Sequence, residues 1–262
     1  MNDRPKTGLA LSSGAARGLA HIGVLKAFEE EGIPVDYIAG SSMGALIGAL
    51  YSAGLPPKVM EGLALSLGRK HIFDWQLTRL GVISGKKIED MLNLLTRGQC
   101  FADTKIPLAV VATDINEGSL IVIKEGPLTT AVRASIAVPG VFPPVEYGQR
   151  LLADGGILCR LPVNEVKEMG ADIVVAIDVG LYIKETTINN LFDVISQTID
   201  IMGKEIMKHN MVEADLLIRP EVGSISLTHF QKSEECIQAG EKAAREALPE
   251  VESLLKERGY IV

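Results

Sequence analysis

The sequence is poor in cysteine and has fewer positive than negative charges. It has three cysteines in 262 residues, an odd number at wide spacing (Cys100, Cys159 and Cys236), so neither a disulfide framework nor a metal-binding motif is visible. The net charge of −7 and the sequence pI near 5.2 argue against nucleic acid as a partner. We therefore expect a cytoplasmic protein that needs no metal and no cofactor.

The N-terminal residues MNDRPKTGLALSSG do not resemble a signal peptide. The uncharged stretch Tyr37–Pro57 reaches the length of about 20 residues that a membrane-spanning helix needs. It contains four glycines and three serines, however, and GSSMG separates a β-type start from an apolar helical end. We interpret it as strand, tight turn and buried helix, so any contact with a membrane would be peripheral.

Apolar strands alternate with helical stretches along the chain, which predicts a mostly parallel sheet covered on both faces, a three-layer α/β/α sandwich. No repeat or linker divides residues 1–262, so we expect a single domain. The predicted strands are Thr7–Leu11, Val35–Ala39, Leu108–Thr113, Leu120–Lys124, Ile173–Asp178 and Asp215–Arg219. The predicted helices are Gly18–Glu31, Met43–Ala53, Asn189–His209 and Lys232–Glu257, the last interrupted at Pro249.

Residues 58–98 fit this alternation least well. Basic residues separate nine apolar ones there: Met60, Leu63, Leu65, Leu67, Ile72, Phe73, Trp75, Leu77 and Leu80. One interpretation is a helical excursion whose apolar face joins the core. The other is a cap over an apolar substrate pocket, or a surface that touches lipid.

The stretch Gly40-Ser41-Ser42-Met43-Gly44 fits the G-x-S-x-G pattern in one register, with Ser42 at its centre. A strand before it and an apolar helix after it are the context in which such a serine is exposed on a sharp turn. The helix N-terminus would stabilise negative charge that develops near Ser42 during acyl transfer. Ser41 would point elsewhere and be structural.

A serine nucleophile needs a base to take its proton. Asp154 in LLADGGI is the strongest candidate, although Asp-Gly is also a common turn pair. The alternative bases are the four histidines, His21, His71, His209 and His229. Two of these, His209 and His229, follow Asp154 in the Ser…Asp…His order of α/β-hydrolases.

The turn Ser12–Gly18 lies between the first strand and the first helix, where backbone N–H groups could bind an oxyanion or a phosphate. A dinucleotide-binding turn is the rival interpretation. It lacks support because serine and alanine stand at two of the glycine places and no acidic residue closes the second strand.

Four ordered motifs together resemble the patatin-like phospholipase family: LALSSGAARGLAHIGVLKAFEEEGI, GSSMG, ASIAVPGVFPPV and ADGG at 153–156. The resemblance implies a Ser–Asp dyad with Ser42 as nucleophile and Asp154 as general base, acting on lipid or other acyl esters through an acyl-enzyme. It also implies an oxyanion hole formed by the turn residues Gly14, Ala15, Ala16 and Arg17. The motif glycines are Gly18, Gly40, Gly44, Gly155 and Gly156.

The sequence departs from the family pattern at Ser13 and Ala15, which stand where glycine is usual. A Cβ atom restricts the backbone, so a turn that needs positive φ at either position would be distorted. The altered turn leaves open a non-catalytic or weakly active lipid- or acyl-binding protein of the same fold. A Ser–His–Asp esterase is a second alternative, because His209 and His229 are possible bases. The sequence does not indicate the oligomeric state.

Overall fold

The computed structural model describes residues 4–66, 74, 81–180, 191–209 and 214–259. The strands are β1 (Thr7–Leu11), β2 (Tyr37–Ser41), β3 (Leu108–Asp114), β4 (Ser119–Ile123), β5 (Val145–Tyr147), β6 (Arg150–Asp154), β7 (Ile173–Ile177) and β8 (Leu216–Ile218). The helices are α1 (Ala20–Glu30), α2 (Met43–Ser52), α3 (Pro57–Ser66), α5 (Lys86–Thr96), α6 (Leu128–Ser135), α7 (Val163–Glu168), α8 (Leu191–His209) and α9 (Ser233–Glu257). Short 3-10 turns include η1 (Ala15–Leu19), η3 (Gly155–Ile157) and η4 (Phe230–Lys232).

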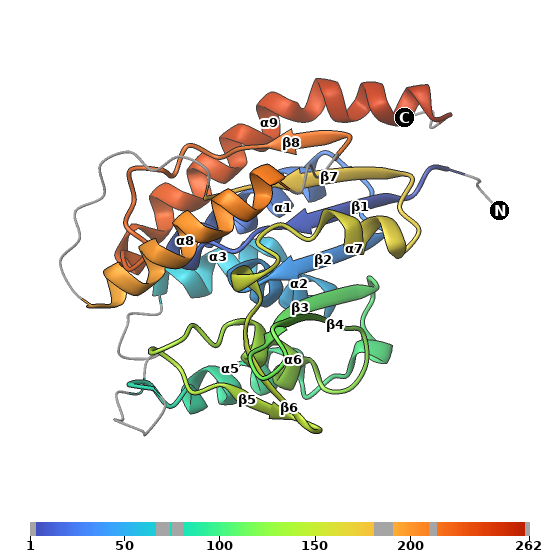
Figure 1. The fold of residues 1–262 in the computed structure, drawn as a ribbon. Helices are drawn as coiled ribbons and strands as arrows, with labels where there is room; N and C mark the ends of the chain where they lie inside the picture. The colour runs from blue at the N-terminus through green and yellow to red at the C-terminus, as the bar shows by residue number, and fades with distance from the viewer. Residues whose placement is uncertain (1–3, 67–73, 75–80, 181–190, 210–213, 260–262) are drawn as a thin grey trace.

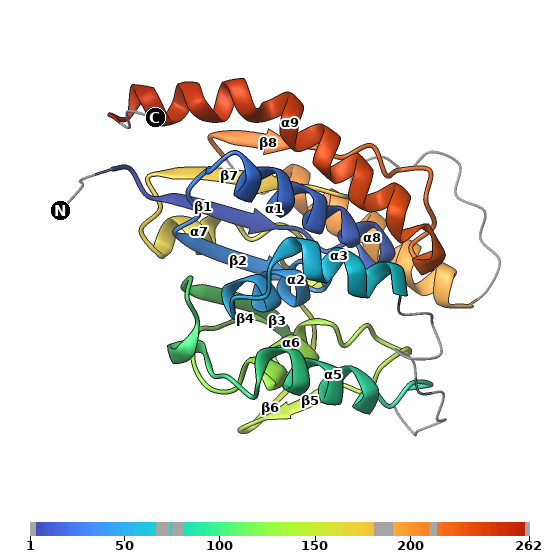
Figure 2. The same ribbon diagram turned by 180° about the vertical axis from the view of Figure 1, so that it is seen from behind.

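The strands form one eight-stranded sheet in which β1, β2, β3, β7 and β8 are parallel. Strands β4 and β6 run antiparallel to β3, and β5 pairs with β6 in a hairpin. Helices α7 and α8 lie on the face that Figure 1 shows in front, and α1, α2, α3 and α9 cover the opposite face in Figure 2. The prediction of a three-layer α/β/α sandwich with a mostly parallel sheet is confirmed.

Side-chain size differs between the two faces of the central strands. A row of alanines, one on each strand from β7 to β3, crosses the α7 face as direct neighbours: Ala176, Ala10, Ala39 and Ala109. These small side chains let α7 pack close to the sheet. On the other face, larger residues such as Leu9, Leu11 and Ile38 are fully buried in the main core with α1 and α2. The alternation follows the two-residue period of a strand.

Strands β2 and β6 meet end to end on the same edge of β3. Val111 pairs with Ser41 of β2 and, on the opposite edge, with Val122 of β4. The next residue, Ala112, pairs with β4 and with Asp154 of β6. Because β4 occupies one edge throughout, β2 and β6 share the other edge. The register therefore brings the carboxyl ends of two distant segments to neighbouring positions.

Two predicted elements are wrong in detail. The second strand begins at Tyr37, not Val35, because Asp36 is engaged with Thr7 by hydrogen bonds from its own N–H and to its carboxylate before the ladder begins. Helix α9 continues through Pro249, where we expected an interruption. Buried residues on one face, including Ala244, Val251 and Leu255, hold both halves of the helix against the core.

The uncharged stretch Tyr37–Pro57 forms β2, a turn and α2, as predicted, and α2 has ten residues. No helix within the described part of the chain combines the length and the apolar character that spanning a membrane would require.

Candidate active site

Ser42 lies on a strained turn between β2 and α2. Its backbone has φ of 51° and ψ of −117°, in a region that residues with a Cβ atom rarely adopt. The surrounding structure holds this conformation, and the backbone N–H of Ser42 donates to the Oγ of buried Ser135 at 2.9 Å. Such strained residues cluster at active sites. The turn also places Ser42 at the N-terminus of α2, where the helix presents unpaired N–H groups and partial positive charge.

The two glycines of the G-x-S-x-G pattern permit the crossing of β2 and α2. A Cβ atom on Gly40 would lie 2.5 Å from the carbonyl oxygen of Gly44. A Cβ atom on Gly44 would lie 2.3 Å from the carbonyl oxygen of Leu11, at the end of β1. Both contacts are with backbone atoms that cannot give way. The small residues are thus required by the close approach of the helix to two strands.

Asp154 is the last residue of β6, and its side chain accepts a hydrogen bond from Ser42. The Oγ atom of Ser42 donates a hydrogen bond to Oδ2 of Asp154 at 2.7 Å. The other carboxylate oxygen, Oδ1, accepts from the N–H of Gly156 in η3 at 2.8 Å. Both side chains are nearly buried, with 7% and 3% relative exposure for Ser42 and Asp154. The carboxylate therefore occupies the place beside the serine that an imidazole holds in a Ser–His–Asp triad.

The turn after β1 supplies N–H groups beside this pair. Within the described residues, the N–H groups of Gly14 and Ala15 have no hydrogen-bond acceptor, and Ala15 lines the same cavity as Ser42. Ala15 has φ of 45°, whereas Ser13 has no positive φ. The expected conflict between a Cβ atom and a left-handed backbone is therefore present at Ala15, and the chain adopts that conformation nonetheless.

The structure reduces the number of N–H groups that could form the predicted oxyanion hole. The N–H of Ala16 donates to the carbonyl of Leu227 at 3.1 Å, and the N–H of Arg17 donates to the carbonyl of Gly14 at 3.0 Å. The guanidinium of Arg17 is fully buried, and its Nε donates to the carbonyl of Ile225 at 2.6 Å. Ala16 and Arg17 therefore attach the turn to the segment after β8, and their N–H groups are already used.

The histidines take positions unlike that of Asp154. His21 is buried in α1, where its Nε2 bonds the carbonyl of Ser12 at 2.9 Å, and burial lowers its pKa to about 4. His229 is half-buried and precedes η4. His71 and the side chain of His209 lie outside the described residues.

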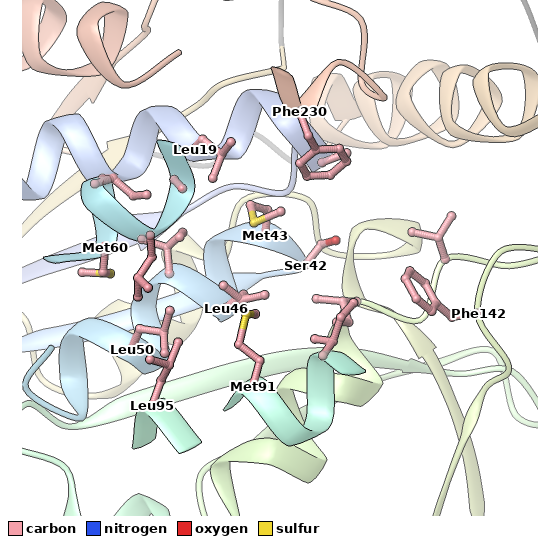
Figure 3. A pocket seen from close by; sticks show the side chains of 18 residues that line it. Leu19, Ser42, Met43, Leu46, Leu50, Met60, Met91, Leu95, Phe142 and Phe230 are labelled. Carbon is pink, nitrogen blue, oxygen red and sulfur yellow. The ribbon is translucent and has the colours of Figure 1, made fainter. Parts of the chain in front are cut away.

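An apolar cavity of about 140 Å³ opens beside Ser42. Figure 3 shows its 18 lining residues, among which Ser42 carries the single polar side-chain atom. We call this cavity the apolar groove. Its lining comes from η1, α1, α2, α3, α5, the residues after α6 and η4: Ala15, Leu19, Ile22, Ser42, Met43, Leu46, Ile47, Leu50, Met60, Leu63, Ala64, Ile88, Met91, Leu95, Ile136, Val138, Phe142 and Phe230.

Residues 58–98 contribute α3 and α5 to the walls of the groove, although part of the segment, including Trp75, lies outside the described residues. Buried Arg133 holds the start of α5. Its Nη2 donates to the carbonyls of Ser84 and Pro143 at 3.0 and 3.3 Å, and its guanidinium lies 5.1 Å from the ring centre of Phe142. Whether these walls act as a substrate cap stays a prediction.

Several residues of the site carry no motif that sequence reasoning could have used. Ser135 lies within ASIAVPGVFPPV, but nothing in the sequence shows that its hydroxyl reaches Ser42. Phe230 lies far along the chain from Ser42 but lines the groove, and Ala16 and Arg17 bind the segment just before it. Among the described residues, no group of three or more His, Cys, Asp or Glu side chains is placed to hold a metal.

Sequence comparison finds one matching protein family and several relatives. Residues 9–167 match the Patatin family, described as patatin-like phospholipase. The chain is 40% identical over 179 residues to an NTE family protein of Mycobacterium tuberculosis, covering 67% of this chain and 49% of the relative. It is 31% identical over 188 residues to the lysophospholipase NTE1 of Debaryomyces hansenii, covering 70% of this chain and 12% of the relative. The chain thus spans about half the length of the first relative and less of the second.

Among solved structures, VipD from Legionella pneumophila superposes with a TM-score of 0.70 over 94% of this chain and 67% of that chain. The sequence identity is 14%, so this similarity shows the fold alone.

Proposed function

The chain belongs to the patatin-like phospholipase family, and from this premise we propose that it is a serine hydrolase of lipid acyl esters. The observation that carries the proposal is the 2.7 Å hydrogen bond from the Ser42 hydroxyl to the Asp154 carboxylate at the end of an apolar groove. An apolar lining with one polar atom suits a substrate that is mostly hydrocarbon with one reacting ester. The name of the D. hansenii relative agrees with this class of substrate.

In the first half of the proposed reaction, Asp154 accepts the hydroxyl proton of Ser42 while Oγ forms a bond to the ester carbonyl carbon. The carbonyl oxygen becomes an oxyanion, which the free N–H groups of Gly14 and Ala15 and the N-terminus of α2 stabilise. The tetrahedral intermediate then expels the alcohol, which takes the proton from Asp154. An acyl-enzyme on Ser42 remains.

In the second half, water loses a proton to Asp154 as it attacks the acyl carbon. The second tetrahedral intermediate then breaks its bond to Ser42 Oγ and releases the carboxylic acid, while Asp154 returns its proton to Oγ. The N–H of Gly156 keeps the carboxylate oriented in both steps, because it binds Oδ1 and leaves Oδ2 for the moving proton. General-base catalysis of this kind contributes about 10²–10⁴-fold to the rate.

The test uses five variants, each assayed on a short p-nitrophenyl ester and with a fluorophosphonate probe. We expect Ser42→Ala to abolish turnover and labelling, and Asp154→Asn to lower kcat by about 10²–10⁴-fold with the fold intact. Ser41→Ala is the matched control, because Ser41 is adjacent, fully buried and outside the groove lining. Turnover that survives Ser42→Ala would refute the proposal. Loss of activity in His209→Ala or His229→Ala, with Asp154→Asn active, would favour the Ser–His–Asp alternative.

A further inference from the structure

The apolar groove follows one face of α2, starting at Ser42. Four residues of this helix line it, Met43, Leu46, Ile47 and Leu50. Their spacing of three, four and seven residues places them in one row along the helix. Because Ser42 immediately precedes the helix, the row leads directly away from the reacting hydroxyl. Figure 3 shows Met43, Leu46 and Leu50 in this order along the cavity.

The row of α2 residues ends among buried apolar side chains. In Figure 3, Leu50, Met60 and Leu95 gather at the end of the groove that is farthest from Ser42. Leu50 has 5% and Met60 has 2% relative exposure, and both side chains belong to the main core. Met60 comes from α3 and Leu95 from α5, the two helices that form the side walls. Halfway along, Leu46 is half-buried and faces the cavity.

We propose that this row measures the acyl chain, and that the enzyme prefers medium-length chains of roughly eight to ten carbons. The proposal rests on the function proposed above. From Ser42 to Leu50 the helix advances by eight residues, or about 12 Å at about 1.5 Å per residue. An extended alkyl chain advances by roughly 1.25 Å per carbon, because bonds of about 1.5 Å alternate at tetrahedral angles. The distance therefore holds about nine or ten carbons before the chain meets Leu50 and Met60.

The expected size of the effect follows from burial. Each methylene transferred from water to an apolar site favours binding by up to about fourfold. The value of kcat/KM should rise with acyl length from acetyl to about decanoyl, as each added carbon finds apolar wall. Beyond that length an added carbon meets the buried side chains of Leu50 and Met60, so the rise stops.

The first experiment measures kcat/KM for a series of p-nitrophenyl esters from acetyl to palmitoyl. Leu46→Trp fills the middle of the row and should move the optimum to butyryl or hexanoyl. Leu95→Trp fills the far end and should lower octanoyl and decanoyl turnover at least about tenfold more than it lowers acetyl turnover. Leu94→Trp is the matched control on the same helix, because Leu94 has 77% relative exposure and lies outside the groove lining; its profile should equal the wild type.

A second measurement needs no turnover. Ser42→Ala protein is titrated with saturated fatty acids of increasing length, with and without Leu46→Trp, and intact folding is checked by circular dichroism. We expect affinity to level off near decanoate, and near butyrate or hexanoate with tryptophan at position 46. A flat length profile, or one that the Leu46 and Leu95 variants leave unchanged, overturns the chain-length proposal while Ser42-dependent hydrolysis stands. Length-dependent binding without Ser42-dependent hydrolysis refutes the proposed function and leaves the groove assignment intact.

Discussion

Replacing His21 by glutamine should make the protein less sensitive to acid. His21 is completely buried, and its Nε2–H donates to the carbonyl of Ser12. The other ring nitrogen, Nδ1, is buried without a hydrogen-bond partner among the described residues. A proton on Nδ1 would therefore be both desolvated and unpaired, and burial lowers the pKa of His21 to about 4. The folded protein keeps this ring neutral.

The sign and size of the effect follow from proton linkage. An unfolded histidine binds a proton below about pH 6.5, whereas folded His21 does so only below about 4, so between these values the unfolded state binds more protons. The free energy of unfolding must then fall as the pH falls. His21 alone should remove about 2 kcal/mol between pH 7 and pH 5, and roughly 3 kcal/mol by pH 4.

Urea unfolding of wild type and His21→Gln, measured from pH 7 to pH 4, checks this effect. Glutamine carries an amide N–H that can reach the Ser12 carbonyl but has no titrating group near these pH values. Carboxylates contribute equally to both proteins, so the difference in unfolding free energy isolates His21. That difference should shift by about 2 kcal/mol in favour of the variant between pH 7 and pH 5. A difference that stays constant with pH would show that burial of neutral His21 does not destabilise the protein in acid.

Two further substitutions and one labelling experiment have defined expected outcomes. Gly44→Ala should destabilise the fold by roughly 3 kcal/mol or more and remove activity, because the new Cβ meets the Leu11 carbonyl; Gly62→Ala, with open space around it, is the control in thermal unfolding. Ala15→Gly should raise the unfolding free energy by about 1 kcal/mol with activity retained, and a loss of stability would contradict the strain at φ of 45°. Burial raises the pKa of Cys236 to about 12, so a disulfide reagent at pH 8 should label this thiol only after unfolding.

The sequence predicted the turn that carries Ser42 better than the shape of the groove around it. The G-x-S-x-G register selects Ser42 over Ser41, because only that register has glycine where β2 and α2 cross. Asp154 alone reads as a common turn residue, and its place depends on the pairing of β6 with β3, which has no local signature. The short strands β5 and β6 and the helices α6 and α7 were not predicted, since few residues define each period.

Arg17 shows the limit of residue-type reasoning most clearly. A cation next to a predicted oxyanion turn suggests a role in binding negative charge. In the structure its guanidinium instead donates hydrogen bonds to two backbone carbonyls, those of Ile225 and Gly223. These acceptors lie about two hundred positions away along the chain, at residues whose sequence shows no complement to arginine. Only the closed fold reveals that contact.

Because β2 and β6 meet on one edge of β3, the residues that position Ser42 and Asp154 differ from those that form the walls of the groove. The distance between Ser42 and Asp154 is set by backbone pairing of β2 and β6 with two adjacent residues of β3, Val111 and Ala112. The walls formed by α3 and α5 come from residues that lie between Ser42 and Asp154 in the sequence. Substitutions in α3 and α5 should therefore change the shape of the apolar groove while Ser42 and Asp154 keep their relative position.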